Sequence, residues 1–258
     1  MPELALPELA TISSLDQVIT SAAVRLFVTR AQAVAPDFAL TAANAEDVAE
    51  VCRRLDGLPL AIELAAARTN LLAPQALLSR LEPRLPLLTG GARDQPARLQ
   101  TMRAAIAWGY DLLAPDEQAL LRRLSIFAGG FTPEAVESVI GLESDGSPIL
   151  VLDRIGSLVD KSLVRREYGS EEARFSLLET VREFAWEQAV AEDEGDAIGA
   201  AHAAWCLDLA ERSRQAMFLP NGERQLQRLA SEHGNLHVAL AWFHLHGDHV
   251  ASYVSPPR

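Results

Sequence analysis

Residues 52–63 read Cys-Arg-Arg-Leu-Asp-Gly-Leu-Pro-Leu-Ala-Ile-Glu, and this stretch predicts two helices joined by a tight corner. Upstream, Asn44 is a suitable N-cap for a helix whose apolar side chains recur on one face, at Val48, Val51, Cys52 and Leu55. Gly57 is suited to the left-handed C′ position that ends this helix. Pro59 is suited to the first position of the next helix, where its missing N–H needs no partner. The second helix is therefore expected to present free backbone N–H groups just beyond the corner.

The rest of the chain divides into stretches of different composition and periodicity. Residues 1–20 are interrupted by proline and predict a connector, whereas residues 21–112 predict a helical bundle without strands. Residues 113–191 predict a second domain, and residues 247–258 predict a tail. Residues 200–246 predict two helices, over residues 202–214 and about 223–246, and Gly234 is expected to weaken the second. The expected fold class is mainly α, with one short β-hairpin in the second domain.

That hairpin follows three predicted helices. Ala114-Pro115-Asp116-Glu117 and Thr132-Pro133-Glu134 are typical helix starts, and a third helix is predicted over residues 147–160. The pattern then changes to alternation in residues 163–168 and 173–177, which indicates two strands around a Gly-Ser turn. Three helices followed by a hairpin are typical of a winged helix-turn-helix domain.

Charge argues against direct DNA binding by this domain. The formal net charge is −12, and phosphate contacts depend on clustered Lys and Arg. In the third helix and hairpin, the basic residues Arg154, Lys161, Arg165, Arg166 and Arg174 are nearly balanced by Asp153, Asp160, Glu167, Glu171 and Glu172. We therefore expect no direct DNA contact, and a DNA-binding winged-helix regulator is kept as the alternative function.

The corner resembles the GLPLA motif of the NB-ARC class of signal-transduction NTPases, also called the STAND family. Residues 21–28 and 175–185 resemble the flanking segments of that family, in particular of its LuxR- and SARP-associated bacterial transcriptional regulators. The motif proline of the family packs against the adenine of a bound nucleotide. The resemblance thus implies an ADP/ATP-binding site that includes Gly57, Leu58, Pro59 and Leu60.

The same resemblance implies the architecture and the role of the chain. Residues 21–112 would be a helical lid, residues 113–191 a winged-helix latch over the nucleotide, and residues 200–246 the start of a tetratricopeptide-like (TPR-like) array. The expected function is part of a nucleotide-switched transcriptional regulator. Expected partners are an upstream phosphate-loop domain and a protein bound by the TPR-like helices. A helical interaction scaffold is a further alternative.

The phosphate-binding half of such a switch is not recognisable in this chain. A phosphate loop reads G-x-x-x-x-G-K-[ST], whereas Lys161-Ser162 is preceded by Asp160 and by Ile155 at the two glycine positions. In many relatives a Met-His-Asp latch motif contacts the β-phosphate, but Leu177, Leu178 and Glu179 align there. We therefore expect no enzyme activity, no catalytic residues and no tightly bound nucleotide, and we interpret Leu178 as a core residue.

The remaining signals favour a cytoplasmic protein without a membrane partner. No signal peptide or stretch of about 18 apolar residues is recognisable. Cys52 and Cys206 are expected to be two buried thiols rather than a disulfide. His233, His237 and His244 share a helical direction, but no Cys or carboxylate joins them at ligand spacing, so we expect no metal site.

Overall fold

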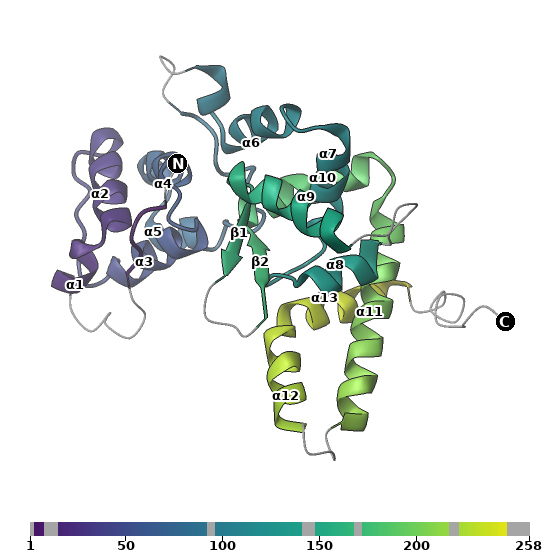
Figure 1. Ribbon diagram of the computed structural model, residues 1–258. Helices are drawn as coiled ribbons and strands as arrows, with labels where there is room; N and C mark the ends of the chain where they lie inside the picture. The colour runs from purple at the N-terminus through teal and green to yellow at the C-terminus, as the bar shows by residue number, and fades with distance from the viewer. Residues whose placement is uncertain are drawn as a thin grey trace. The chain divides into compact units, whose positions relative to one another are not determined.

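The computed structural model describes residues 3–7, 15–91, 96–140, 148–167, 172–216 and 222–246. Figure 1 shows a mainly helical protein with one two-stranded antiparallel sheet in the described part of the chain, which confirms the expected fold class. The chain divides into two compact units, Met1–Leu112 and Leu113–Arg258. The predicted tail at residues 247–258, part of the predicted connector and Glu171 lie outside the described residues.

The first unit is a helical bundle around an apolar core. Its elements are α1 (Leu15–Thr20), α2 (Ala22–Val34), α3 (Ala45–Arg54), α4 (Pro59–Ala66), the 3-10 helix Ala67–Asn70, α5 (Pro74–Leu78), the 3-10 helix Ala97–Leu99 and α6 (Met102–Asp111). Helix α2 packs on α4 and α3 packs on α5. Phe27, Cys52 and Ile62 are fully buried, and burial raises the pKa of the Cys52 thiol to about 12. The prediction of a buried, unpaired thiol is confirmed.

The corner between α3 and α4 has the predicted proline start, but its helix stop differs from the prediction. Asp56 is the first left-handed residue, with φ 55°, and Gly57 is the second, with φ 67°. The Gly57 N–H donates to the Cys52 carbonyl at 3.1 Å and the Asp56 N–H donates to the Arg53 carbonyl at 2.9 Å. These two bonds form a Schellman motif with Asp56 at C′, because the short Asp side chain tolerates this conformation.

Glycine is nevertheless needed at position 57 because the N-terminal segment lies against it. The Leu4 N–H donates to the Gly57 carbonyl at 2.9 Å, and a Cβ atom at position 57 would lie 2.6 Å from the Leu4 carbonyl oxygen. At the other end of α3, the Asn44 side chain makes no capping bond. Its Oδ1 instead accepts from the Thr41 N–H at 2.8 Å, so Asn44 closes the preceding turn.

The second unit begins with a winged helix. Its elements are α7 (Pro115–Leu124), α8 (Pro133–Ile140), α9 (Pro148–Asp160), β1 (Val164–Glu167), β2 (Arg174–Leu177) and α10 (Glu179–Ala191). Val164 pairs with Leu177 and Glu167 pairs with Arg174 in the antiparallel hairpin. The sequence missed one pairing: Phe131, between α7 and α8, exchanges backbone hydrogen bonds with Phe175 at 2.8 and 2.9 Å. This bridge joins the segment between α7 and α8 to the edge of β2 that does not pair with β1.

Three helices complete the second unit: α11 (Gly195–Ala216), α12 (Gly222–Ser231) and α13 (His233–His246). Helix α11 packs on both α12 and α13. The sequence predicted one continuous helix over residues 223–246, and this prediction is wrong, because the chain turns at Glu232. Gly234 lies so close to the chain at Ala128 that a Cβ atom there would be 2.3 Å from the Ala128 carbonyl oxygen. The glycine that weakens a helix in isolation is therefore required by packing.

The turn at Glu232 holds the second unit together through a network that we call the Arg174 clamp, formed by Arg174, Glu232, Asn235 and the backbone of Gly129-Gly130. Arg174 Nη1 donates to Glu232 Oε1 at 2.6 Å. Its Nη2 donates to the Gly129 carbonyl at 2.9 Å and to the Gly130 carbonyl at 3.2 Å. Asn235 Oδ1 accepts from the Ala128 N–H at 2.8 Å, and its Nδ2 donates to the Gly130 carbonyl at 2.9 Å. The clamp thus joins β2 to the start of α13.

Both charges of the clamp are buried, since the Arg174 and Glu232 side chains are 9% and 3% exposed. Glu232→Ala is expected to lower the free energy of unfolding by about 3 kcal/mol or more, because the guanidinium remains buried without its carboxylate. Urea denaturation of the full chain measures this loss.

The matched control is Asp208→Ala, which removes the ion pair with Arg212 on α11, where both side chains are 61% exposed. Its expected cost is below about 1 kcal/mol. Equal losses in the two variants would show that the buried clamp contributes no more than a surface pair.

Candidate nucleic-acid interface

Helix α9 is the third helix of the winged helix and exposes one face. Ile155 and Leu158 are fully buried, whereas Leu152, Asp153 and Arg154 are exposed. In the same helix, no neighbouring atom lies within 4 Å of a Cβ atom built on Gly156. The exposed face of α9 therefore has room for another molecule to approach its backbone, and Leu152, 51% exposed, adds apolar surface to it.

A buried carboxylate fixes the other side of α9 to α7. Glu117 Oε1 accepts from Ser157 Oγ at 2.5 Å and from Lys161 Nζ, and Glu117 Oε2 accepts from the Ala114 N–H at 2.9 Å. These bonds lower the pKa of the Glu117 carboxyl to about 2, and the hydrogen bond from Lys161 is the largest cause. Lys161, although 41% exposed, thus helps to hold α9 against α7.

The other predicted cations fall into two groups. Arg174 is buried in the clamp and does not belong to the exposed face of the wing. Arg154 is 49% exposed and lies 3.5 Å from Asp116, which is 52% exposed, so this ion pair is weak and separable. In β1, Arg166 is exposed and Arg165 is half-buried. Besides Lys161, the exposed or half-buried cations of α9 and β1 are therefore Arg154, Arg165 and Arg166.

The predicted nucleotide residues lie in the first unit, at the start of α4. Gly57 and Leu58 are buried, and Pro59 and Leu60 are half-buried. Pro59 occupies a first-turn position of α4, as predicted. The adenine contact stays a prediction of the resemblance.

Other sequence predictions concern the second unit. Leu178 is 7% exposed and Val181 is 3% exposed, which confirms the interpretation of this stretch as core. The rings of His233 and His237 are tilted by 59° to each other, with centroids 4.3 Å apart. Within the described ranges, no three His, Cys, Asp or Glu side chains are grouped as metal ligands. No helix in the described part of the chain is long and apolar enough to cross a membrane.

Comparison with known proteins agrees with this architecture. Residues 113–189 match the family model of the winged helix-turn-helix domain. The chain is 43% identical over 224 residues to "Putative HTH-type transcriptional regulator Rv0890c" of Mycobacterium tuberculosis (strain ATCC 25618 / H37Rv), which covers 87% of this chain and 25% of the relative. It is also 43% identical over 180 residues to "Uncharacterized protein Rv0894" of the same strain, covering 70% of this chain and 46% of that relative. The chain therefore spans less than half the length of these relatives.

These matches overturn the expectation that the domain makes no direct DNA contact. The physical reason is that counting acidic and basic residues along the sequence does not show which of them are buried or paired in the folded protein. Lys161 is paired with the buried Glu117, and Arg174 is buried with Glu232, whereas Arg154 and Arg166 are exposed. No pattern in the sequence links Arg174 to Glu232, 58 residues away. Residues 113–189 form a winged helix-turn-helix domain, and the chain is similar to HTH-type regulators.

The Glu117 contacts predict a specific pH dependence of stability. The carboxyl has a pKa of about 2 in the folded chain instead of 4.5, so protons bind more strongly to the unfolded chain between these values. The unchanged chain should therefore exceed Glu117→Gln in free energy of unfolding by a constant amount above pH 4.5. This difference should shrink as the pH falls toward 2. Urea denaturation of both proteins at several pH values measures this difference. A difference that does not change with pH would contradict the assignment.

Proposed function

We propose that the winged helix of residues 113–189 contacts DNA as part of a transcriptional regulator. The observation that carries the proposal is the exposed face of α9 beside the β1–β2 hairpin, in a domain that matches the winged helix-turn-helix family. The third helix of such a domain enters the major groove, and the hairpin lies along the backbone. The similarity to HTH-type transcriptional regulators supports the same function.

The charges assign different roles to the two parts of this interface. Arg154, Arg165 and Arg166 are placed to bind phosphates, since each lies on α9 or β1 and is at least partly exposed. The exposed Asp153 and Asp160 would repel phosphates, so α9 must approach the bases rather than the backbone. Leu152 can contact a thymine methyl group, and a carboxylate can accept from cytosine N4. Few phosphate contacts predict moderate affinity that depends on salt.

The double variant Arg154→Ala/Arg166→Ala is expected to weaken binding of the full chain to duplex DNA selected from a random-sequence pool. Because two phosphate contacts are lost, the slope of log affinity against log salt concentration should fall by about 2. Fluorescence anisotropy of labelled duplexes at several salt concentrations measures both quantities.

Arg212→Ala is the matched control, because Arg212 is also an exposed arginine in an ion pair, with a side chain 61% exposed. It should leave the affinity and the slope unchanged. If the pool yields no binding duplex, or if the double variant binds like the control, the proposal is wrong.

We further propose the finer function that the family resemblance implies, in which the first unit contributes to an ADP/ATP switch. It is supported by the corner at residues 57–60, where Pro59 is half-buried at the first turn of α4 and leaves part of its ring accessible. In this proposal Pro59 contacts the adenine, and a phosphate loop outside the present sequence binds the phosphates.

Adenosine and ADP are therefore expected to bind this chain with similar, weak affinity, because the phosphates gain no contact in it. Pro59→Ala should weaken both, whereas Pro115→Ala, at the first turn of α7, should not. Amide chemical-shift titrations of the unchanged chain and of both variants measure the affinity for each ligand. The proposal would be contradicted by tight Mg²⁺-dependent binding of ATP, or by no binding of adenosine.

A further inference from the structure

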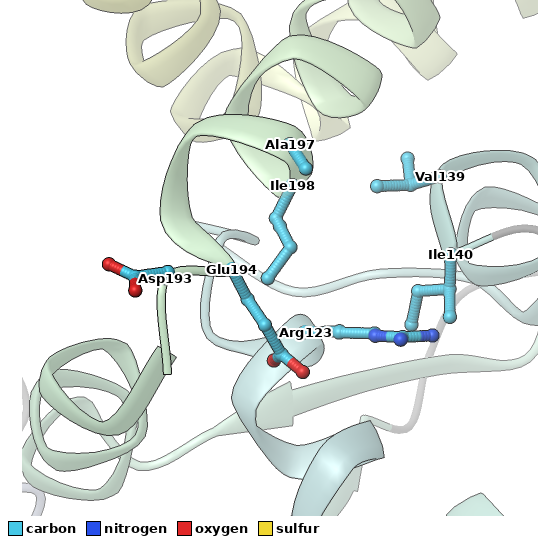
Figure 2. Close-up of a pocket in the computed structure, with 7 residues that line it drawn as sticks. All are labelled: Arg123, Val139, Ile140, Asp193, Glu194, Ala197 and Ile198. Carbon is cyan, nitrogen blue, oxygen red and sulfur yellow. The ribbon is translucent and has the colours of Figure 1, made fainter. Parts of the chain in front are cut away.

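A pocket of about 310 Å³ opens in the second unit between α7, α8, the α10–α11 turn and α11. Its volume lies at the lower end of the range for small-molecule sites. Figure 2 shows the lining residues: Arg123, Val139, Ile140, Asp193, Glu194, Ala197 and Ile198. None of these residues belongs to the α9–β1 surface described above, so the pocket is a separate site.

One wall of the pocket is aliphatic. Val139 and Ile140 end helix α8, and Ala197 and Ile198 lie in the first turns of α11. Figure 2 shows Ile198 and Val139 on facing sides, from different helices. Apolar side chains in this arrangement favour a ligand with a short hydrocarbon group.

The polar side of the pocket carries the guanidinium of Arg123 and the carboxylate of Glu194. Arg123 follows Arg122, whose Nε and Nη2 donate to the two carboxylate oxygens of Glu194 at 3.0 and 2.9 Å. Glu194 is thus matched by Arg122. The hydrogen bonds from Arg122 and, to a smaller extent, the nearby charge of Arg123 lower the pKa of the Glu194 carboxyl. No hydrogen bond from Arg123 is found among the described residues, and Figure 2 shows its side chain extended beneath Ile140.

The second acidic residue of the lining, Asp193, does not face Arg123. Asp193 is the left-handed residue after α10, with φ 56°, and it is exposed. Figure 2 shows its carboxylate directed away from the other lining side chains. The pocket therefore combines an aliphatic wall with a half-buried guanidinium that lies near the Glu194 carboxylate but is not hydrogen-bonded to it among the described residues.

We propose that this pocket binds a small aliphatic carboxylate, with the carboxylate on Arg123 and the hydrocarbon group against Val139, Ile140 and Ile198. A guanidinium presents parallel N–H donors that match the two oxygens of a carboxylate. The occupant contacts α8 of the winged helix and α11 of the C-terminal helices at once. The site is independent of the proposed DNA contact, and its occupancy is measured without DNA.

The test uses 4-methylpentanoate as the probe and 4-methylpentan-1-amine as its cationic counterpart, titrated into the full chain by calorimetry. The carboxylate is expected to bind saturably, and the amine is not. Arg123→Gln should weaken carboxylate binding about tenfold or more, which is the contribution of a charged hydrogen-bonded pair.

A second variant, Ala197→Leu, fills the pocket from an exposed position of α11 without changing any charge and should also remove binding. Arg212→Gln is the control and should bind like the wild type. The proposal is overturned if the carboxylate does not bind, if the amine binds equally well, or if Arg123→Gln and Ala197→Leu bind like the control.

Discussion

The buried ion pair between Arg174 and Glu232 is the constraint on which the second unit depends. A guanidinium that is 9% exposed must be matched by a carboxylate and by carbonyl oxygens, and both come from segments distant in sequence. The backbone at Gly129-Gly130 supplies the carbonyls, and the turn between α12 and α13 supplies the carboxylate. Because the donor lies on β2, the position of the wing and the position of the C-terminal helices are fixed by the same bonds.

The same constraint explains how the domain uses its few cations. Arg174 and Lys161 hold the fold through Glu232 and Glu117, whereas Arg154, Arg165 and Arg166 are exposed or half-buried on α9 and β1. A protein with a formal charge of −12 can therefore still carry a local phosphate-binding surface. The two proposed sites of this unit, the α9–β1 surface and the Arg123 pocket, each include arginines that are at least partly exposed.

Local signals predicted the elements well. The proline start of α4, the period of α3 and the alternation in the hairpin each depend on neighbouring residues, and the structure has all three. The predictions failed where distant segments meet. The break at Glu232, the pairing of Phe131 with Phe175 and the burial of Arg174 depend on partners between 44 and 107 residues away in the sequence. Gly234 was interpreted as a helix-weakening residue because the sequence does not show its close contact with Ala128.

The sequence by itself determined the mainly helical class, the winged helix and the corner at residues 57–60, because helix starts, stops and periodicity are properties of adjacent residues. Only the tertiary structure decided which charges are internal and which face outward, and which glycines are needed for close approach. Burial and ion pairing are set by the packing of segments that the chain brings together only when folded. The candidate DNA surface and the carboxylate pocket both depend on which charged side chains the fold buries and which it leaves exposed.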